Sequence, residues 1–74
     1  MSGLLSISFR KLARALVRLG FKPVRQSGSH MIFKHPDGRA TVVPNHARED
    51  IGPGLLRKIL KDANVDPSTF REKL

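Results

Sequence analysis

The sequence has no cysteine, tryptophan or tyrosine, and its only aromatic side chains are four phenylalanines. Without cysteine, neither a disulfide framework nor a thiolate zinc site can form. No run approaches the roughly 20 apolar residues that a membrane-spanning helix needs. Residues 1–6 have no basic stretch followed by a long apolar one, which argues against a secretory signal peptide. These absences lead us to expect a cytoplasmic protein.

The chain is also too short for more than one domain, since it has 74 residues. A core in so small a protein typically contributes only about 3–5 kcal/mol. We therefore expect a single domain over residues 1–74, with its core within about residues 8–65 and a polar tail over residues 66–74. The fold should be simple, and a partner can help to hold it.

Acidic residues are scarce, with six against 14 Lys and Arg, so the net charge is +8 at pH 7. Residues 1–48 carry this whole excess, because they hold a single acid, Asp37, and the rest of the chain has five charges of each sign. A concentrated basic surface is typical of polyanion binders, although a solvated surface can have the same composition. The basic residues of this part are Arg10, Lys11, Arg14, Arg18, Lys22, Arg25, Lys34, Arg39 and Arg48.

Two segments have the apolar periodicity of helices. Residues 8–19 repeat apolar side chains at helical spacing, with Ser8 as a suitable N-cap, Gly20 as a suitable end and basic residues on the outer face. The second helix is predicted over residues 55–63, and residues 66–70 indicate a last polar turn or short helix. A basic membrane-surface helix is disfavoured because the cations also occupy strands and turns.

Three short segments between the helices are predicted to be strands, over residues 21–26, 30–35 and 39–43. The turn signals at residues 27–29 and 36–38 make them an antiparallel meander. Both faces of the middle strand carry apolar residues, so the pattern does not tell which face the helices cover. The order predicts a two-layer α+β domain, αβββα, with two helices on one face of a three-stranded sheet, as in double-stranded-RNA-binding domains. Such a fold alone does not establish a function.

His30 is the candidate catalytic residue, because it opens the middle strand directly after the Gly28-Ser29 turn. Glycine lets a ligand approach the backbone, and exposed turn amides can hold an anion. Metal-free RNA cleavage needs a base for the 2′-hydroxyl, an acid for the leaving 5′-oxygen and cations for the phosphate, and histidine can carry either proton near neutrality. A histidine at this place can also be an ordinary polar residue that ends a loop and has no catalytic role. The candidate RNA-binding residues are Lys22, Arg25, Gly28, Ser29, Lys34, Arg39 and His46.

Other chemistries fit the sequence less well. His35 is expected to be a turn residue, and His46 a loop residue or a phosphate contact. The three histidines lack the spacing of metal ligands and have few acids near them, so we expect no metal and no cofactor. Ser27 and Ser29 have no acid–base partners in the pattern of a serine hydrolase.

Several motifs occur together in a fixed order: Gly20-Phe21, Arg25 to His30, Phe33 to Arg39, Val43 to His46, Pro53-Gly54 and Leu56 to Leu60. In these motifs the chain resembles the HicA (YcfA-like) toxin family from about residue 8 to residue 65. The resemblance implies a double-stranded-RNA-binding-domain-like fold and a ribosome-independent mRNA interferase that arrests translation. It also implies that the histidine of the Gly-Ser-His motif, here His30, is catalytic, and that a HicB antitoxin binds the toxin and covers this site.

The chain departs from the family at two places. Leu55 stands where the family usually has threonine, which removes a hydroxyl that could cap the second helix. Asn64 stands where a glycine is usual, and asparagine also tolerates the left-handed conformation. Two other functions stay open: a non-catalytic RNA-binding module of the same fold, and a domain whose acidic protein partner explains its charge. The second proton carrier is also open between water, His46 and a cation-assisted leaving group.

Overall fold

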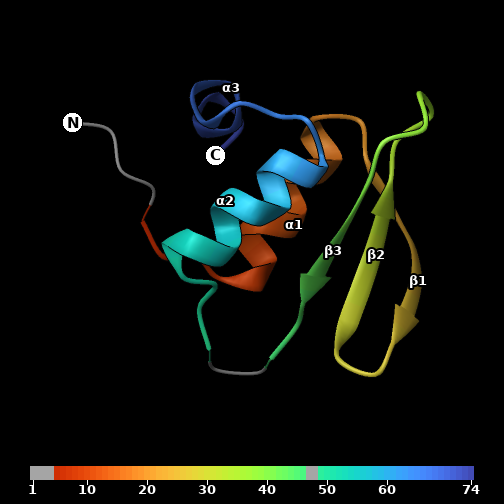
Figure 1. Ribbon diagram of the computed structural model, residues 1–74, viewed down its shortest axis with the longest axis horizontal. Helices are drawn as coiled ribbons and strands as arrows, with labels where there is room; N and C mark the ends of the chain where they lie inside the picture. The colour runs from red at the N-terminus through yellow and green to blue at the C-terminus, as the bar shows by residue number, and fades with distance from the viewer. Residues whose placement is uncertain (1–4, 47–48) are drawn as a thin grey trace.

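The computed structural model describes residues 5–46 and 49–74, and it confirms the predicted αβββα order (Figure 1). The segment predicted to be a last polar turn or short helix is a short helix. A three-stranded antiparallel sheet of order β1-β2-β3 forms one layer, and α1 and α2 lie beside each other on one of its faces. The fold is therefore α+β and like that of a double-stranded-RNA-binding domain. The elements are α1 (Phe9–Arg18), β1 (Lys22–Ser27), β2 (His30–Lys34), β3 (Ala40–Pro44), α2 (Pro53–Asp62) and α3 (Pro67–Glu72).

The first helix begins and ends where its sequence predicts. The Ser8 hydroxyl accepts a hydrogen bond from the Lys11 N–H at 3.2 Å, and Gly20 follows the helix with a φ of 101°. A positive φ of this kind suits glycine, which has no Cβ. Val17 is exposed although it belongs to the predicted apolar residues, because at 100° per residue it falls outside the stripe of Leu12 and its buried neighbours.

The second helix begins two residues earlier than predicted, at Pro53, and its N-cap is Gly52. Proline suits the first helical position because its missing N–H would have no partner there and its φ is already helical. No side chain caps this helix start. The bounds of the three strands lie within one residue of the predicted bounds.

One face of the sheet is covered by the helices, and the residues of β2 identify which face. Phe33 is fully buried, Met31 is partly buried, and their partners on β3, Thr41 and Val43, are buried too. The Thr41 hydroxyl donates to the Ile59 carbonyl at 2.9 Å, which ties β3 to α2. The alternate residues of β2 therefore belong to the uncovered face.

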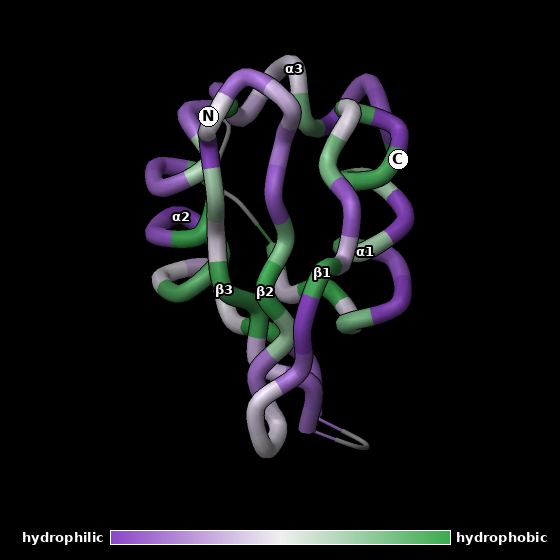
Figure 2. Tube along the Cα trace, turned by 90° about the vertical axis from the view of Figure 1, so that its right-hand side faces the viewer, coloured by the Kyte–Doolittle hydropathy of each residue, from purple (hydrophilic) through white to green (hydrophobic). Residues whose placement is uncertain are grey.

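The uncovered face begins with His30 and continues through Ile32 to Lys34 along β2. Figure 2 looks onto this side of the molecule, with the strands in front of α1 and α2. Val42 on β3, opposite Ile32, is exposed on this face. His30 and its cationic neighbours thus share a surface that the fold itself leaves open.

The core reaches beyond the range predicted for it, residues 8–65. Ile7 is buried and exchanges two backbone hydrogen bonds with Ile51, so the segment before α1 is fixed to the loop before α2. Phe70 is also buried, and it brings α3 into the core. The final segment is therefore a packed helix with one apolar anchor.

Candidate active site

The turn between β1 and β2 presents His30. Gly28 has a φ of 58°, which favours glycine, and its carbonyl accepts a hydrogen bond from the side-chain Nε2 of Gln26 at 3.0 Å. His30 is the first residue of β2 and pairs with Ser27 across the turn. Its side chain is exposed. The backbone of His30 is thus held by the sheet while its imidazole is accessible to a large substrate.

The loop after β3 lies against the same turn. Pro44 pairs with His30 from the other side, and the Asn45 N–H donates to the Ser29 carbonyl. His46 follows directly and is exposed. Figure 1 shows the β1–β2 turn and the carboxyl end of β3 at the same end of the molecule. The structure therefore brings His46 to the end of the sheet where His30 lies.

A hollow of about 410 Å³ joins this loop to the start of α1. Its lining includes Asn45 and His46 from the loop and Phe9 and Arg10 from the helix. Arg10 is exposed and so adds a cation to this end of the molecule. We did not predict a role for Arg10, because the sequence places it on the outer face of α1 without telling at which end of the sheet that helix begins.

The predicted cations of the open face lie at different distances from His30. Arg25 pairs with Ile32, which follows His30 on the same face of β2. Lys22 and Lys34 pair with each other at the far end of that face. Lys34 is four residues from His30, or about 13 Å along the strand. Of these three cations, Arg25 is therefore the one nearest to the candidate catalytic residue.

Arg39 is placed quite differently from Arg25. Its Nε donates to Asp37 Oδ2 at 2.8 Å, and its Nη1 donates to the Ala63 carbonyl at 2.9 Å and to that of Asn64 at 3.3 Å. Its guanidinium carbon lies 5.1 Å from the centre of the Phe21 ring. These contacts join the β2–β3 turn to the end of α2, so they give Arg39 a structural role far from His30.

His35 belongs to the same structural cluster, in agreement with its interpretation as a turn residue. Its Nδ1 accepts from the Asp37 N–H at 3.1 Å, and its ring meets Phe21 edge-on with 5.1 Å between centres. A Cβ on Gly20 would lie 2.6 Å from His35 Nε2, so only glycine fits beneath the ring. His35 lies at the opposite end of β2 from His30.

The carboxylate of Asp37 is stabilised in its charged form by this cluster. The pKa of Asp37 is lowered from its ordinary value of 3.8, first by a hydrogen bond from the Arg39 N–H, then by the Arg39 guanidinium and by the nearby His35. The β2–β3 turn is therefore held by charge as well as by packing.

Neither a metal centre nor a membrane-spanning helix is present in the part of the chain that the structure describes. Within residues 5–46 and 49–74, no three His, Asp or Glu side chains gather as a metal centre requires. In the same part of the chain, no helix is both long and apolar enough to cross a bilayer. The acids Glu49 and Asp50 line the same hollow as His46, but these three side chains do not form such a group.

Together, the fold and the site define a class of small basic domains, like double-stranded-RNA-binding domains, with an exposed histidine at one end of the sheet. The family model described as HicA toxin of bacterial toxin–antitoxin matches residues 9–65, which is most of the chain. The chain therefore belongs to the HicA toxin family, and its partner is an antitoxin. No curated protein matches it. The matched region contains His30 and the turn before it.

Proposed function

We propose that this toxin is an mRNA interferase, a metal-independent endoribonuclease that arrests translation, with His30 as a general acid or base. The observation that supports this best is the placement of His30. Its backbone is fixed at the start of β2, its side chain is exposed, and the Gly28–Ser29 turn lies directly beside it. Since its substrate would be mRNA, we propose that the toxin acts in the cytoplasm.

The proposed reaction is an internal transfer of the phosphate ester. The ribose 2′-oxygen attacks the adjacent phosphorus, the bond to the 5′-oxygen breaks, and the products are a 2′,3′-cyclic phosphate and a free 5′-hydroxyl. One group takes the proton of the 2′-hydroxyl and another gives a proton to the 5′-oxygen. His30 performs one of these transfers. Of the other two histidines, His46 lies at the same end of the sheet and His35 at the opposite end, so we assign the second transfer to His46.

The RNA backbone would follow the cations of the open face. Arg25 is the proposed contact to the reacting phosphate, together with the turn at Gly28 and Ser29. Lys22 and Lys34 would hold phosphates farther along the strand. We do not assign Arg39 to RNA, because its guanidinium already binds Asp37 and the end of α2.

The antitoxin is proposed to be of the HicB type and to cover His30. The open sheet face supports this proposal, because it places the apolar side chains of Ile32 and Val42 beside His30. Apolar surface of this kind gains stability when a partner removes it from water. Covering it would also prevent RNA from reaching the imidazole.

The test is cleavage of end-labelled single-stranded RNA in EDTA by wild-type protein and by His30→Ala. A single acid–base group contributes about 10²–10⁴ in rate, so the variant should lose at least about a hundredfold while its affinity for RNA is unchanged. A matched RNA with 2′-deoxyribose at the cleaved position should be resistant, because the attacking hydroxyl is missing. His46→Ala should also slow cleavage.

Two outcomes would count against catalysis by His30. Equal cleavage by wild type and His30→Ala would indicate another active site or a contaminating nuclease. Tight RNA binding without cleavage by either protein would favour the non-catalytic RNA-binding module. The exposed cations of the open face are compatible with that second function, so binding alone does not decide between them.

A further inference from the structure

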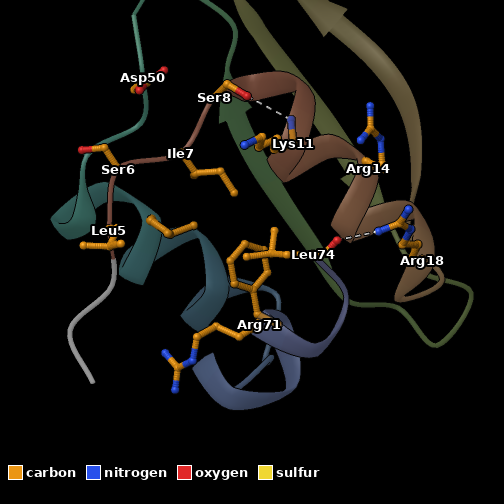
Figure 3. Close-up of a pocket in the computed structure, with 12 residues that line it drawn as sticks. Leu5, Ser6, Ile7, Ser8, Lys11, Arg14, Arg18, Asp50, Arg71 and Leu74 are labelled. Atoms are coloured by element: carbon orange, nitrogen blue, oxygen red, sulfur yellow. Dashed lines mark hydrogen bonds between the residues drawn. The ribbon is translucent and has the colours of Figure 1, made fainter. Parts of the chain in front are cut away.

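A second concave surface lies on the helical side of the molecule, away from the open sheet face (Figure 3). It is a groove of about 600 Å³ between α1, α3 and the segment that precedes α1. The floor is apolar, since it is made by Ile7, Leu56 and Phe70. Leu5 and Leu74 also line the groove and are 81% and 57% exposed. Apolar surface of this kind is therefore open to solvent here.

The groove is bordered by cations on two sides. Lys11, Arg14 and Arg18 follow one another at spacings of three and four residues, which places them in one row along α1. Arg71 approaches from α3, and Figure 3 shows it on the other side of the groove from that row. Asp50 is the single acid in the lining. The groove thus combines an apolar floor with a strongly basic rim.

One of these cations already binds backbone oxygens. Arg18 Nη1 donates to the backbone oxygen of Lys73 at 2.8 Å and to that of Leu74 at 3.0 Å. Across the described part of the chain, the side chains of Lys11, Arg14 and Arg71 have neither a hydrogen bond nor an ion pair with another residue. Three positive charges around the apolar floor are therefore available to a ligand.

We propose that this groove binds an acidic, amphipathic segment of the antitoxin, in addition to the contact over His30. Apolar side chains of the segment would cover Leu5, Leu74 and the floor, while its carboxylates would pair with Lys11, Arg14 and Arg71. The proposal rests on the proposed function only through the antitoxin, and it does not depend on RNA cleavage.

A protein segment fits this groove better than an RNA strand does. Sites for single-stranded RNA combine cations with exposed aromatic side chains on which the bases stack. The one aromatic residue in the lining, Phe70, is only 1% exposed, and so it offers no face for stacking. Leu5 and Leu74 would contribute nothing to a phosphate contact, whereas apolar peptide side chains can bury them.

The test compares two double variants of the full chain. Lys11→Glu with Arg14→Glu reverses the charge of the groove, and Arg57→Glu with Lys61→Glu reverses two exposed cations on α2. Each pair changes the net charge by the same amount, so general attraction to an acidic partner is lowered equally. The groove pair should raise the Kd for the purified antitoxin by about tenfold more than the control pair, chiefly through slower association at low salt.

Folding and the opposite wall provide the remaining controls. An acid three residues after the N-cap is favourable at a helix start, so the groove pair should remain folded, as thermal unfolding would verify. Arg71→Gln changes α3 instead of α1 and should weaken antitoxin binding as well.

Equal losses for the groove and control pairs would overturn the proposal. It would also be overturned if the groove pair lost RNA binding while keeping its affinity for the antitoxin, since the groove would then be a nucleic-acid surface. The Kd comparison remains readable if the wild-type protein cuts no RNA, because binding of the antitoxin is measured directly. Failure of the proposed function can thus be distinguished from failure of this inference.

Discussion

Arg25 and Arg39 have the same side chain, and the sequence predicts that both bind RNA, yet their surroundings in the structure differ. Arg25 is exposed on β1, near His30 on the open face. Arg39 binds Asp37 and two carbonyls at the end of α2. The sequence around Arg39 does not indicate this difference, because the carbonyls that Arg39 binds belong to residues 63 and 64, which are far away along the chain.

Alanine at these two positions should therefore affect different properties of the protein. Arg39→Ala should lower the free energy of unfolding by about 1.5–3 kcal/mol, the usual range for hydrogen bonds to a charged group. Arg25→Ala should change stability by less than about 0.5 kcal/mol, as expected for an exposed side chain. It should instead slow RNA cleavage and weaken RNA binding. Urea unfolding and cleavage assays on both variants would measure these differences.

The reverse result would require a different division of roles. If Arg39→Ala kept its stability and lost RNA binding, Arg39 would contact RNA as the sequence predicted, and its contacts to α2 would be dispensable.

The geometry of the candidate site could be predicted where it depends on neighbouring residues in the sequence, and not where it depends on tertiary contacts. Gly28, Ser29 and His30 are adjacent, so the turn and its histidine could be recognised together. The approach of His46 depends on the Asn45–Ser29 hydrogen bond, and that of Arg10 depends on how α1 crosses the sheet. Neither contact leaves a local pattern in the sequence.

The short helix α3 is held in place by its N-cap and by one buried side chain in the turn that follows. Asp66 is its N-cap and accepts hydrogen bonds from the Thr69 hydroxyl at 2.6 Å and the Thr69 N–H at 3.3 Å. Phe70 anchors the next turn in the core. With one apolar residue in a six-residue helix, no periodicity could have predicted that this segment packs.

The cap makes stability depend on pH in a defined direction. The Thr69 hydroxyl and then the Thr69 N–H hold the pKa of Asp66 below its ordinary value of 3.8. A carboxyl whose pKa is lower in the folded state stabilises the fold above its ordinary pKa, and this contribution is lost as the pH falls through the folded value. The melting temperature should therefore decrease below about pH 4.

Asp66→Asn isolates this contribution, because asparagine can still cap the helix but cannot ionise. The difference in melting temperature between wild type and Asp66→Asn should be largest above about pH 4 and should shrink in more acidic solution. Glu72→Gln, at the exposed end of the same helix, is the matched control. A constant difference across this range would show that ionisation of Asp66 does not matter.

The sequence predicted the bounds of the strands to within one residue, but it did not predict which face of the sheet the helices cover. Met31 and Ile32 are both apolar neighbours on β2, so alternation alone was ambiguous. The helices resolve it, because Phe33 lies against them and fixes Met31 on the same side. The buried face of β2 is thus determined by packing against residues that are far away in the sequence.

Small size makes the whole fold sensitive to the loss of one core residue. Phe70→Ala should cost about 3–5 kcal/mol, the usual range for removing a buried phenylalanine. This is comparable to the roughly 3–5 kcal/mol that a core of this size supplies. The variant should be largely unfolded at 25 °C by circular dichroism. Leu55→Ala, at an exposed leucine, should remain folded.

Binding of the antitoxin over the open sheet face, which does not include Phe70, should restore structure to Phe70→Ala, since a ligand that binds the native state stabilises it by mass action. A variant that stayed as stable as wild type without its partner would show that α3 is not part of the cooperative unit.

The irregularity in β1 has a consequence for the toxin when it is alone. β1 is an edge strand, and its pairing with β2 shifts between Pro23 and Arg25. Pro23 has no N–H to offer a further strand, and Lys22 and Arg25 would bring like charges together if two copies met edge to edge. The interrupted strand is therefore a poor template for β-aggregation, and two copies of the free toxin should not pair through their β1 edges after the antitoxin has been removed.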